Sequence, residues 1–327
     1  MSETKPFLLS VRLMTYNHEA FILEAMKSVD AQQTNFDFEV VVGDDFSTDR
    51  TAEIFAGFES ENPRAHWKVI QREKGDAYHI ARQQNGRVQN FYDILQKCSG
   101  KYIALLDGDD YWTDPKKLQK QVNLLEQYPE LAGCFHNSIV VNAKSEMTYD
   151  RYYEGVDGSR HDQEDSVTNL RSAYSTGSLV YRNEAMQPHM EEFLKIGTDF
   201  ILEVMITNYG DLQFIDQNMS AYRFHEGGVW QGNTMQKNRM EVAARYLFLF
   251  NTEPYRSRYN KLLWNRVMEI YDELLVRSRD TAFKEEIKAK IDDFLDYSEL
   301  RTYGYLWKRL LRSLHYRRKM LLNRPGN

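Results

Sequence analysis

The chain has 327 residues, 42% hydrophobic and 13% aromatic, which is enough apolar material for one large domain or two smaller ones. Its net charge of -6 argues against general nucleic-acid binding. No apolar stretch approaches the roughly 18 residues that a membrane-spanning helix requires, and the N-terminus lacks a secretory signal pattern, so we expect a cytoplasmic protein.

Short β-rich runs alternate with amphipathic stretches in the first half of the sequence, and this alternation predicts βαβ units. The expected strands cover residues 7–13, 38–42, 67–70 and 102–106. The expected helices cover residues 19–33 and 49–60, the second capped by Ser47 or Thr48, and a further helix carries Val88, Phe91, Leu95 and Cys98. Such a sequence builds an α/β fold, a Rossmann-like and mostly parallel sheet flanked by helices, which binds ligands beyond the carboxyl ends of its strands.

The second half begins with a helix signal, because Asp114 is followed by Pro115. Residues 143–169 are polar and are expected to form a long loop, after which STGSLVYR resumes a strand. Beyond residue 232 the pattern is almost wholly helical. From residue 305 onward basic and apolar side chains are interleaved, which is typical of a helix on an anionic membrane surface or of a basic helix packed on its own domain.

Three carboxylates follow the strand expected at residues 102–106. These are Asp107, Asp109 and Asp110, separated only by Gly108. Two like charges about 4 Å apart in a partly protein-like dielectric repel by roughly 4 kcal/mol. The cluster is therefore costly unless a cation or hydrogen-bond donors offset its charge.

A second acidic group, Asp44, Asp45 and Asp49, follows the strand expected at residues 38–42. In isolation it is better described as a polar turn that leads into a helix. If neighbouring parallel strands end side by side, however, both acidic groups face one crevice. Oxygen ligands of this kind suit Mg2+ or Mn2+, with phosphate oxygens completing the coordination.

Three motifs at successive strand ends carry a resemblance to a known family: TYNHE, GDDFSTDRT and LLDGDDYWTDPKKL. Together they resemble the family 2 glycosyltransferases, inverting enzymes with the GT-A fold, over roughly residues 8–230. The resemblance implies a GT-A catalytic domain over residues 1–232, with a nucleotide-sugar half at about 1–110 and an acceptor half at about 111–232. A helical C-terminal region with a basic amphipathic end would occupy residues 233–327.

The resemblance also implies roles for the acidic residues. Asp45 would contact the nucleotide base, whereas Asp107 and Asp109 would bind the nucleotide-sugar and Asp109 and Asp110 the metal, either Mn2+ or Mg2+. Asp199, in KIGTDFILEVM, would be the catalytic base that accepts the proton of the acceptor hydroxyl. The alternative for Asp199 is a helix N-cap.

Further candidates lie near the same strand ends. In YRFHEGGVW, Arg223 is a candidate diphosphate partner and His225 a third metal ligand, although a lone histidine is more often structural. The remaining candidates for nucleotide-sugar binding are Thr15, Tyr16, Asn17 and Arg87, for which turn or helix-start roles are equally available.

Two other functions compete. The acidic motif nearly fits the haloacid-dehalogenase phosphatases, except that Tyr111 stands where they have Thr or Val. A non-catalytic nucleotide-sugar-binding protein could have the same fold. The sequence favours an inverting, metal-dependent transferase that moves a sugar from a UDP-sugar to a hydroxyl of a glycan or lipid-linked acceptor. We expect a role in surface polysaccharide or glycoconjugate biosynthesis, with possible peripheral contact to the inner face of a membrane.

Overall fold

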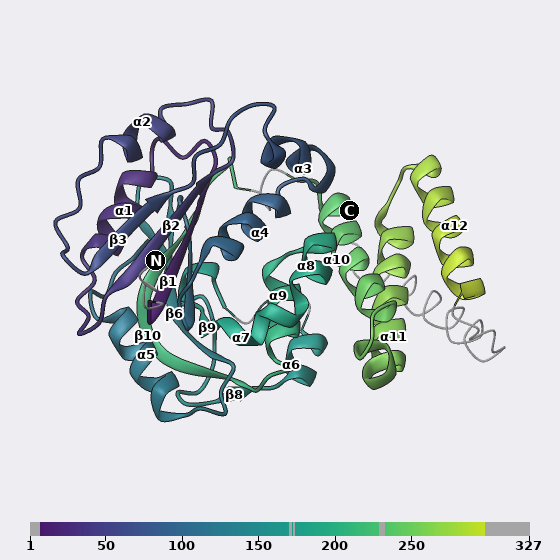
Figure 1. The fold of residues 1–327 in the computed structure, drawn as a ribbon. Helices are drawn as coiled ribbons and strands as arrows, with labels where there is room; N and C mark the ends of the chain where they lie inside the picture. Colours follow the sequence, from purple (N-terminus) through teal and green to yellow (C-terminus); the bar gives the residue numbers. More distant parts are fainter. Residues whose placement is uncertain (1–6, 170–171, 173, 229–232, 298–327) are drawn as a thin grey trace, which may run out of the picture. The chain divides into compact units, whose positions relative to one another are not determined.

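The computed structural model describes residues 7–169, 172, 174–228 and 233–297, and Figure 1 shows it as a ribbon. The chain divides into two compact units, residues 1–231 and 232–327. The first unit is an α/β structure and the second is helical in its described part. The α/β class and the helical C-terminal region predicted from the sequence are therefore present.

A mixed sheet of ten strands lies at the centre of the first unit, in its described residues. Its main order is β3-β2-β1-β4-β9-β6-β10-β5, with β7 on β6 and β8 on β10. The strands are β1 (Leu9–Thr15), β2 (Phe38–Asp44), β3 (Ala65–Val69), β4 (Tyr102–Asp107), β5 (Tyr111–Trp112), β6 (Gly133–Asn142), β7 (Met147–Tyr149), β8 (Arg160–His161), β9 (Val180–Arg182) and β10 (Leu212–Phe224). Strands β3, β2, β1 and β4 are all parallel, as predicted, and β6 is parallel to β10, whereas β9 and β5 run antiparallel to their neighbours.

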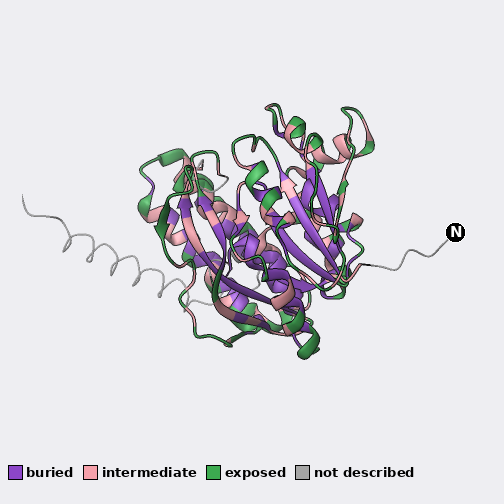
Figure 2. Ribbon diagram, turned by 90° about the vertical axis from the view of Figure 1, so that its left-hand side faces the viewer, coloured by how far each residue is buried: buried purple, intermediate pink, exposed green. Residues whose placement is uncertain are grey.

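Helices flank the sheet (Figure 1). They are α1 (Ile22–Asp30), α2 (Thr51–Ala56), α3 (Ala77–Asn85), α4 (Val88–Lys97), α5 (Lys117–Gln127), α6 (Gln163–Thr168), α7 (Asn183–Met186), α8 (Met190–Ile196) and α9 (Asp199–Ile206), with 3-10 turns η1 (Thr176–Ser178) and η2 (Gln187–His189). Helix α1 buries Ile22, Ala25, Met26 and Val29, the spacing of one helix face. Because helices cover the sheet, its central strands are buried nearly throughout, as the purple strands of Figure 2 show.

Three local predictions need correction. Helix α2 begins at Thr51 and neither Ser47 nor Thr48 caps it, because both bind Asn17 instead. Helix α5 begins at Lys117 rather than at Pro115. The stretch 143–169, predicted as a loop, contains β7, β8 and α6, whose short lengths and polar side chains hid them from a periodicity analysis.

The second unit contains α10 (Met235–Phe250), α11 (Tyr255–Arg277) and α12 (Thr281–Tyr297). Aromatic rings pack between them, with the centroids of Phe250 and Phe294 5.1 Å apart. The basic stretch predicted to contact a membrane, residues 305–327, lies outside the described residues. Among the helices that are described, none combines the length and the hydropathy needed to cross a bilayer.

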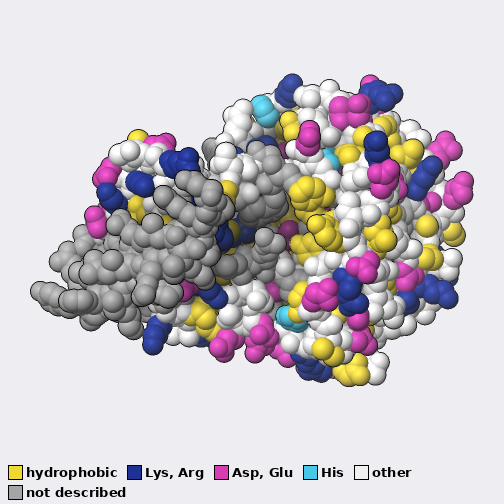
Figure 3. All heavy atoms as spheres, turned by 180° about the vertical axis from the view of Figure 1, so that it is seen from behind, with side chains coloured by type: hydrophobic (Ala, Val, Ile, Leu, Met, Phe, Trp, Pro, Cys, Tyr) yellow, Lys and Arg dark blue, Asp and Glu magenta, His cyan; other side chains and the backbone are white. Residues whose placement is uncertain are grey.

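Charges of both signs cover the surface. On the face drawn in Figure 3, lysine and arginine side chains are interspersed with aspartate and glutamate over the described residues. The mixed charge of this face agrees with the small net charge of -6.

Candidate active site

The carboxyl ends of three neighbouring parallel strands meet at one edge of the sheet. In the register of the ladders, Thr15 at the end of β1 lies opposite Asp44 of β2, and Met14 lies opposite Asp107 of β4. Asp45 donates its backbone N–H to the carbonyl of Thr15 (3.0 Å), and Gly108 donates its own to the carbonyl of Met14 (2.8 Å). The two acidic groups therefore flank the end of β1, as the sequence predicted.

The carboxylate of Asp107 is bound by a buried arginine of β1. Its carboxylate accepts a hydrogen bond of 2.6 Å from Arg12, whose side chain is fully buried and lies 4.3 Å from the ring centre of Phe91. Burial raises the pKa of Asp107; Arg12 opposes that rise, while the charges of Asp109 and Asp199 add to it.

Two histidines flank Asp109. The carboxylate Oδ2 lies 3.0 Å from His225 Nε2 and 3.8 Å from His18 Nε2. Although burial acts in the opposite direction, the hydrogen bond with His225 and the nearby His18 hold the pKa of Asp109 below its usual value. His225 is thus beside the acidic loop as predicted, and His18 is a site residue that the sequence analysis did not identify.

Asp110 ties the acidic loop to β10. Its Oδ1 accepts the backbone N–H of Arg223 at 2.7 Å, and the residue is only 4% exposed. Burial raises the pKa of Asp110 well above its usual value, and the charge of Asp109 raises it further. A negative charge on Asp110 beside that of Asp109 is therefore unfavourable unless a cation offsets it.

Arg223 holds the acidic loop in place. Its Nε donates to the carbonyl of Asp109 (2.7 Å), its Nη2 pairs with Glu24 (2.5 Å), and its Nη1 donates to the carbonyl of Asn142 (3.1 Å). The guanidinium also lies 4.7 Å from the ring centre of Phe21. These contacts give Arg223 a positioning role, and its contact with a diphosphate stays a prediction.

Asp45 is engaged by two side chains from α3. Arg82 Nε lies 2.7 Å from Asp45 Oδ2, and the Tyr78 hydroxyl donates to Oδ1 at 2.7 Å. Arg72 stacks on Tyr78, with its guanidinium carbon 3.6 Å from the ring centre. Arg87, by contrast, is exposed at the start of α4.

The loops after β1 and β2 are joined to each other. Asn17 donates its N–H to Ser47 Oγ (2.8 Å) and accepts the N–H of Thr48 at its Oδ1 (2.7 Å). It has a φ of 54°, a left-handed conformation that asparagine tolerates better than most residues. Tyr16 is 50% exposed beside it, and Thr15 Oγ1 lies 3.3 Å from His18 Nδ1. Thr15, Tyr16 and Asn17 thus line the same edge as Asp45.

Asp199 is the first residue of α9, and the helix cap is Thr198, whose hydroxyl accepts the N–H of Ile201. The alternative that Asp199 is an N-cap is therefore wrong. Its carboxylate accepts a hydrogen bond from Thr176 Oγ1 (3.0 Å). The neighbouring Gly177 accepts the indole N–H of Trp112 at 2.8 Å, so the segment that orients Asp199 is anchored two residues after Asp110.

The acidic loop fits a divalent cation held together with a ligand. Within the described part of the chain, no three His, Cys, Asp or Glu side chains form a complete metal site. Mg2+ and Mn2+, however, are commonly held by one or two protein ligands plus phosphate oxygens. Asp109 and His225, whose ligand atoms are 3.0 Å apart, match that smaller set, and Asp110 follows Asp109 as a further carboxylate.

Gly108 leaves no room for a side chain. A Cβ at this position would lie 2.8 Å from Thr15 Oγ1, 2.9 Å from His18 Nδ1 and 3.0 Å from Ile22 Cδ1. We expect Gly108→Ala to lower the free energy of unfolding by about 1–3 kcal/mol, because the acidic loop must shift. Chemical denaturation measures this, with Gly57→Ala as the control, since a Cβ there meets nothing closer than 3.5 Å. Equal stabilities of the two variants would contradict the prediction.

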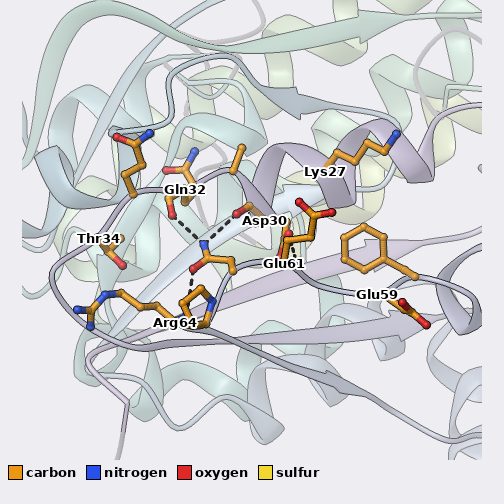
Figure 4. Close-up of a pocket in the computed structure, with 12 residues that line it drawn as sticks. Lys27, Asp30, Gln32, Thr34, Glu59, Glu61 and Arg64 are labelled. Carbon is orange, nitrogen blue, oxygen red and sulfur yellow. Dashed lines mark hydrogen bonds between the residues drawn. The ribbon is translucent and has the colours of Figure 1, made fainter.

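A cavity of about 670 Å³ lies at the opposite edge of the sheet (Figure 4). It is lined by the end of α1 and by the loops that precede β2 and β3. Asn62 closes this region by donating to the carbonyls of Asp30 and Gln32, both at 2.8 Å. The predicted site residues do not line this cavity, so we do not assign it to the active site.

The sequence and fold match known glycosyltransferases. Residues 10–187 match the family described as Glycosyl transferase family 2. An uncharacterized protein of Mycobacterium tuberculosis is 32% identical over 231 residues, covering 68% of this chain and 60% of that protein. The putative teichuronic acid biosynthesis glycosyltransferase TuaG of Bacillus subtilis is 24% identical over 81% of this chain and 94% of its own length. The crystal structure of S. aureus TarS 1-349 with UDP-GlcNAc superposes with a TM-score of 0.53 at 16% identity, covering 84% of this chain and 74% of that one.

The chain belongs to glycosyl transferase family 2, since the family match covers more than half of its residues. Its fold is the GT-A type, which the similarity to TarS supports. The chain spans about 60% of the length of its mycobacterial relatives. Family membership favours a transferase over the phosphatase alternative.

Proposed function

We propose that the protein is an inverting, metal-dependent glycosyltransferase. The donor would be a nucleotide-sugar, most simply a UDP-sugar, and the acceptor a hydroxyl of a glycan or lipid-linked molecule in surface polysaccharide or glycoconjugate biosynthesis. The observation that carries the proposal is that Asp45 and the acidic loop flank the end of β1, while Thr176 binds the Asp199 carboxylate next to Gly177, which is hydrogen-bonded to Trp112 just after the acidic loop. The UDP-GlcNAc bound by TarS and the teichuronic acid role ascribed to TuaG support the donor and the acceptor class.

In the proposed reaction, one bond forms as another breaks. Asp199 accepts the proton of the acceptor hydroxyl, whose oxygen attacks the anomeric carbon on the face opposite the diphosphate. The anomeric carbon–diphosphate bond breaks in the same step, which inverts the configuration. Thr176 orients the Asp199 carboxylate throughout through its 3.0 Å hydrogen bond.

The donor side of the site would be held by the loops after β1, β2 and β4. Asp45, whose carboxylate is bound by Arg82 and Tyr78, would contact the nucleotide base. Tyr16 and Asn17 would contact the base with it. Asp107 and Asp109 would bind the donor beside the cation, with Asp109 and His225 as ligands and Asp110 as a further candidate. A divalent cation supplies charge neutralisation for the departing diphosphate when it is bound. Arg223 would keep the acidic loop in register during this step.

Calorimetry tests the donor site. We expect UDP to bind in the presence of Mn2+, with at least about tenfold weaker binding without the metal or in the Asp109→Ala, Asp110→Ala double variant. Asp211→Ala removes a carboxylate at the start of β10, at the other end of that strand, and should leave the affinity unchanged. If no nucleoside diphosphate in a panel of UDP, GDP, ADP and CDP binds with or without Mn2+, the donor-site assignment is wrong.

A further inference from the structure

One face of strands β6 and β10 begins beside the segment that binds the proposed base, Asp199, and extends away from it. Ser138 of β6 lies opposite Ser220 of β10, and their hydroxyls are 2.7 Å apart. Ser138 also binds the hydroxyl of Ser175 at 2.6 Å, so the segment that carries Thr176 covers this pair. Because side chains alternate along a strand, the next residues on this same face are Val140 and Asn142 on β6 and Tyr222 and Phe224 on β10.

Four aromatic side chains gather on this face next to the covered pair, and we call them the aromatic wall: Tyr149, Tyr152, Tyr222 and Phe224. Tyr149 lies opposite Val140 in the β6–β7 ladder, and therefore on the face of Tyr222. The rings of Tyr152 and Tyr222 pack edge to face with their centres 5.4 Å apart. Tyr149 is 69% exposed, Phe224 56% and Tyr152 39%. So much exposed aromatic surface on one sheet face points to a binding role.

The wall adjoins both catalytic elements. Strand β10 pairs with β5 so that Ala221 lies opposite Tyr111. The Asp110 carboxylate accepts the backbone N–H of Arg223, the residue that follows Tyr222, at 2.7 Å. Tyr222 is two residues from Ser220, a distance of about 7 Å along a strand. The backbone N–H of Tyr152 donates to Asn137 Oδ1 (3.0 Å), next to Ser138 on β6. Ser138 binds Ser175, and the preceding residue, Tyr174, donates its hydroxyl to the carbonyl of Asp199 at 2.9 Å.

We propose that the aromatic wall is an acceptor subsite that binds a pyranose ring of a glycan. A pyranose has one face of axial C–H bonds, which is apolar and slightly positive, and this fits the negative face of an aromatic ring. The wall is uncharged, so it favours a neutral sugar over a phosphate group. The proposal rests on the proposed function and adds to it that the acceptor presents a sugar ring beside its reacting hydroxyl.

Saturation-transfer difference NMR tests the wall directly. The probes are methyl β-glucoside, methyl β-galactoside and methyl α-mannoside, with ribitol as a ring-free polyol, in the presence of UDP and Mg2+. We expect saturation transfer to the axial ring protons of at least one glycoside and none to ribitol. Tyr152→Ala and Tyr222→Ala should each weaken glycoside binding about fivefold or more, while Tyr152→Phe, which keeps the ring, retains it.

Tyr209→Ala is the matched control, because Tyr209 is a 44% exposed tyrosine that follows α9 and bonds to Glu184, outside the wall. UDP affinity is measured on every variant by calorimetry, and unchanged values show that the donor site is intact. Absence of UDP binding in the wild type would count against the proposed function. With UDP binding intact, the subsite is overturned by equal signals in wild type and Tyr152→Ala, by no glycoside signal, or by a dimer that the Tyr152 substitution dissociates.

Discussion

We expect Asp199→Asn to lower the rate of sugar release from the bound nucleotide-sugar by about 10²–10⁴-fold, the usual contribution of a general base. Asparagine has nearly the same shape, so the hydrogen bond with Thr176 can persist while the ability to accept a proton is lost. The measurement is the release of UDP from whichever UDP-sugar binds by calorimetry, with either water or a sugar hydroxyl as the acceptor. The affinity for UDP should stay within about twofold, because the change lies outside the donor contacts.

Asp211→Asn is the control for this experiment, since it removes one negative charge at the far end of β10. If Asp199→Asn and the wild type release UDP at the same rate, the base lies elsewhere. If the wild type binds UDP-sugars and releases no UDP with any acceptor, the protein is a binder on a transferase fold. Either result would contradict the proposed mechanism while leaving the family and the fold as they are.

A second large effect is expected at Lys117, the first residue of α5. Its side chain is fully buried, its ammonium lies 4.2 Å from the ring centre of Trp112, and within the described residues its Nζ has no hydrogen-bond partner. Burial lowers the pKa of Lys117 from its usual 10.5 to about 7. Folding at acid or neutral pH therefore has to bury a positive charge that only an aromatic face stabilises.

We expect Lys117→Met to raise the free energy of unfolding by about 2–4 kcal/mol at pH 6. The folded-state pKa is depressed, so the unfolded chain binds more protons than the folded chain between about pH 7 and 10.5. Wild-type stability is therefore lowest, as far as this group is concerned, below pH 7, and it recovers as the pH rises toward 10.5. The advantage of the methionine variant should shrink accordingly, by about 3 kcal/mol between pH 6 and pH 9.

Guanidinium denaturation at the two pH values measures this effect, with Lys116→Met as the control, since Lys116 is the exposed neighbour in the sequence. The control should change stability by less than about 0.5 kcal/mol at either pH. A Lys117→Met protein that is less stable than the wild type at pH 6 would show that the ammonium is stabilised more strongly than its surroundings indicate. His136 is also buried, and burial and the charge of Lys117 both lower its pKa. Its titration would therefore contribute to the same change of stability with pH.

The sequence was sufficient to predict the strands that carry the donor site. The runs before Asp45 and Asp107 consist mainly of apolar residues that favour strands. Strands β2 and β4 were therefore predicted to within two residues of their observed ends. The convergence of the two acidic groups followed from parallel pairing alone, and the β1 ladders confirm it. Periodicity also placed a strand in STGSLVYR, which contains β9, but it gave no sign of that strand's antiparallel direction, and it missed β5, which is only two residues long.

The partners of the site residues were beyond prediction because they depend on side-chain directions in loops. Arg82 is four residues from Tyr78 and so shares its helix face, a spacing that was visible in the sequence, but nothing local shows that the face points at Asp45. His18 lies in the TYNHE motif, yet its approach to Asp109 arises from how two loops pack. The sequence predicted that Arg223 lies near the acidic residues. Its hydrogen bond to the carbonyl of Asp109, however, depends on the twist of β10.

The bond between Asp110 and the backbone of Arg223 joins residues 113 positions apart in the chain. During synthesis, all three carboxylates of the acidic loop leave the ribosome long before the strand that fixes two of them exists. Until β10 is made, the growing chain carries a cluster of like charges in which Arg12 pairs with Asp107 but Asp110 still lacks its bond to β10. Closure of so long a segment is slow. A nascent or truncated chain that ends before residue 223 would therefore possess the motif without possessing the site.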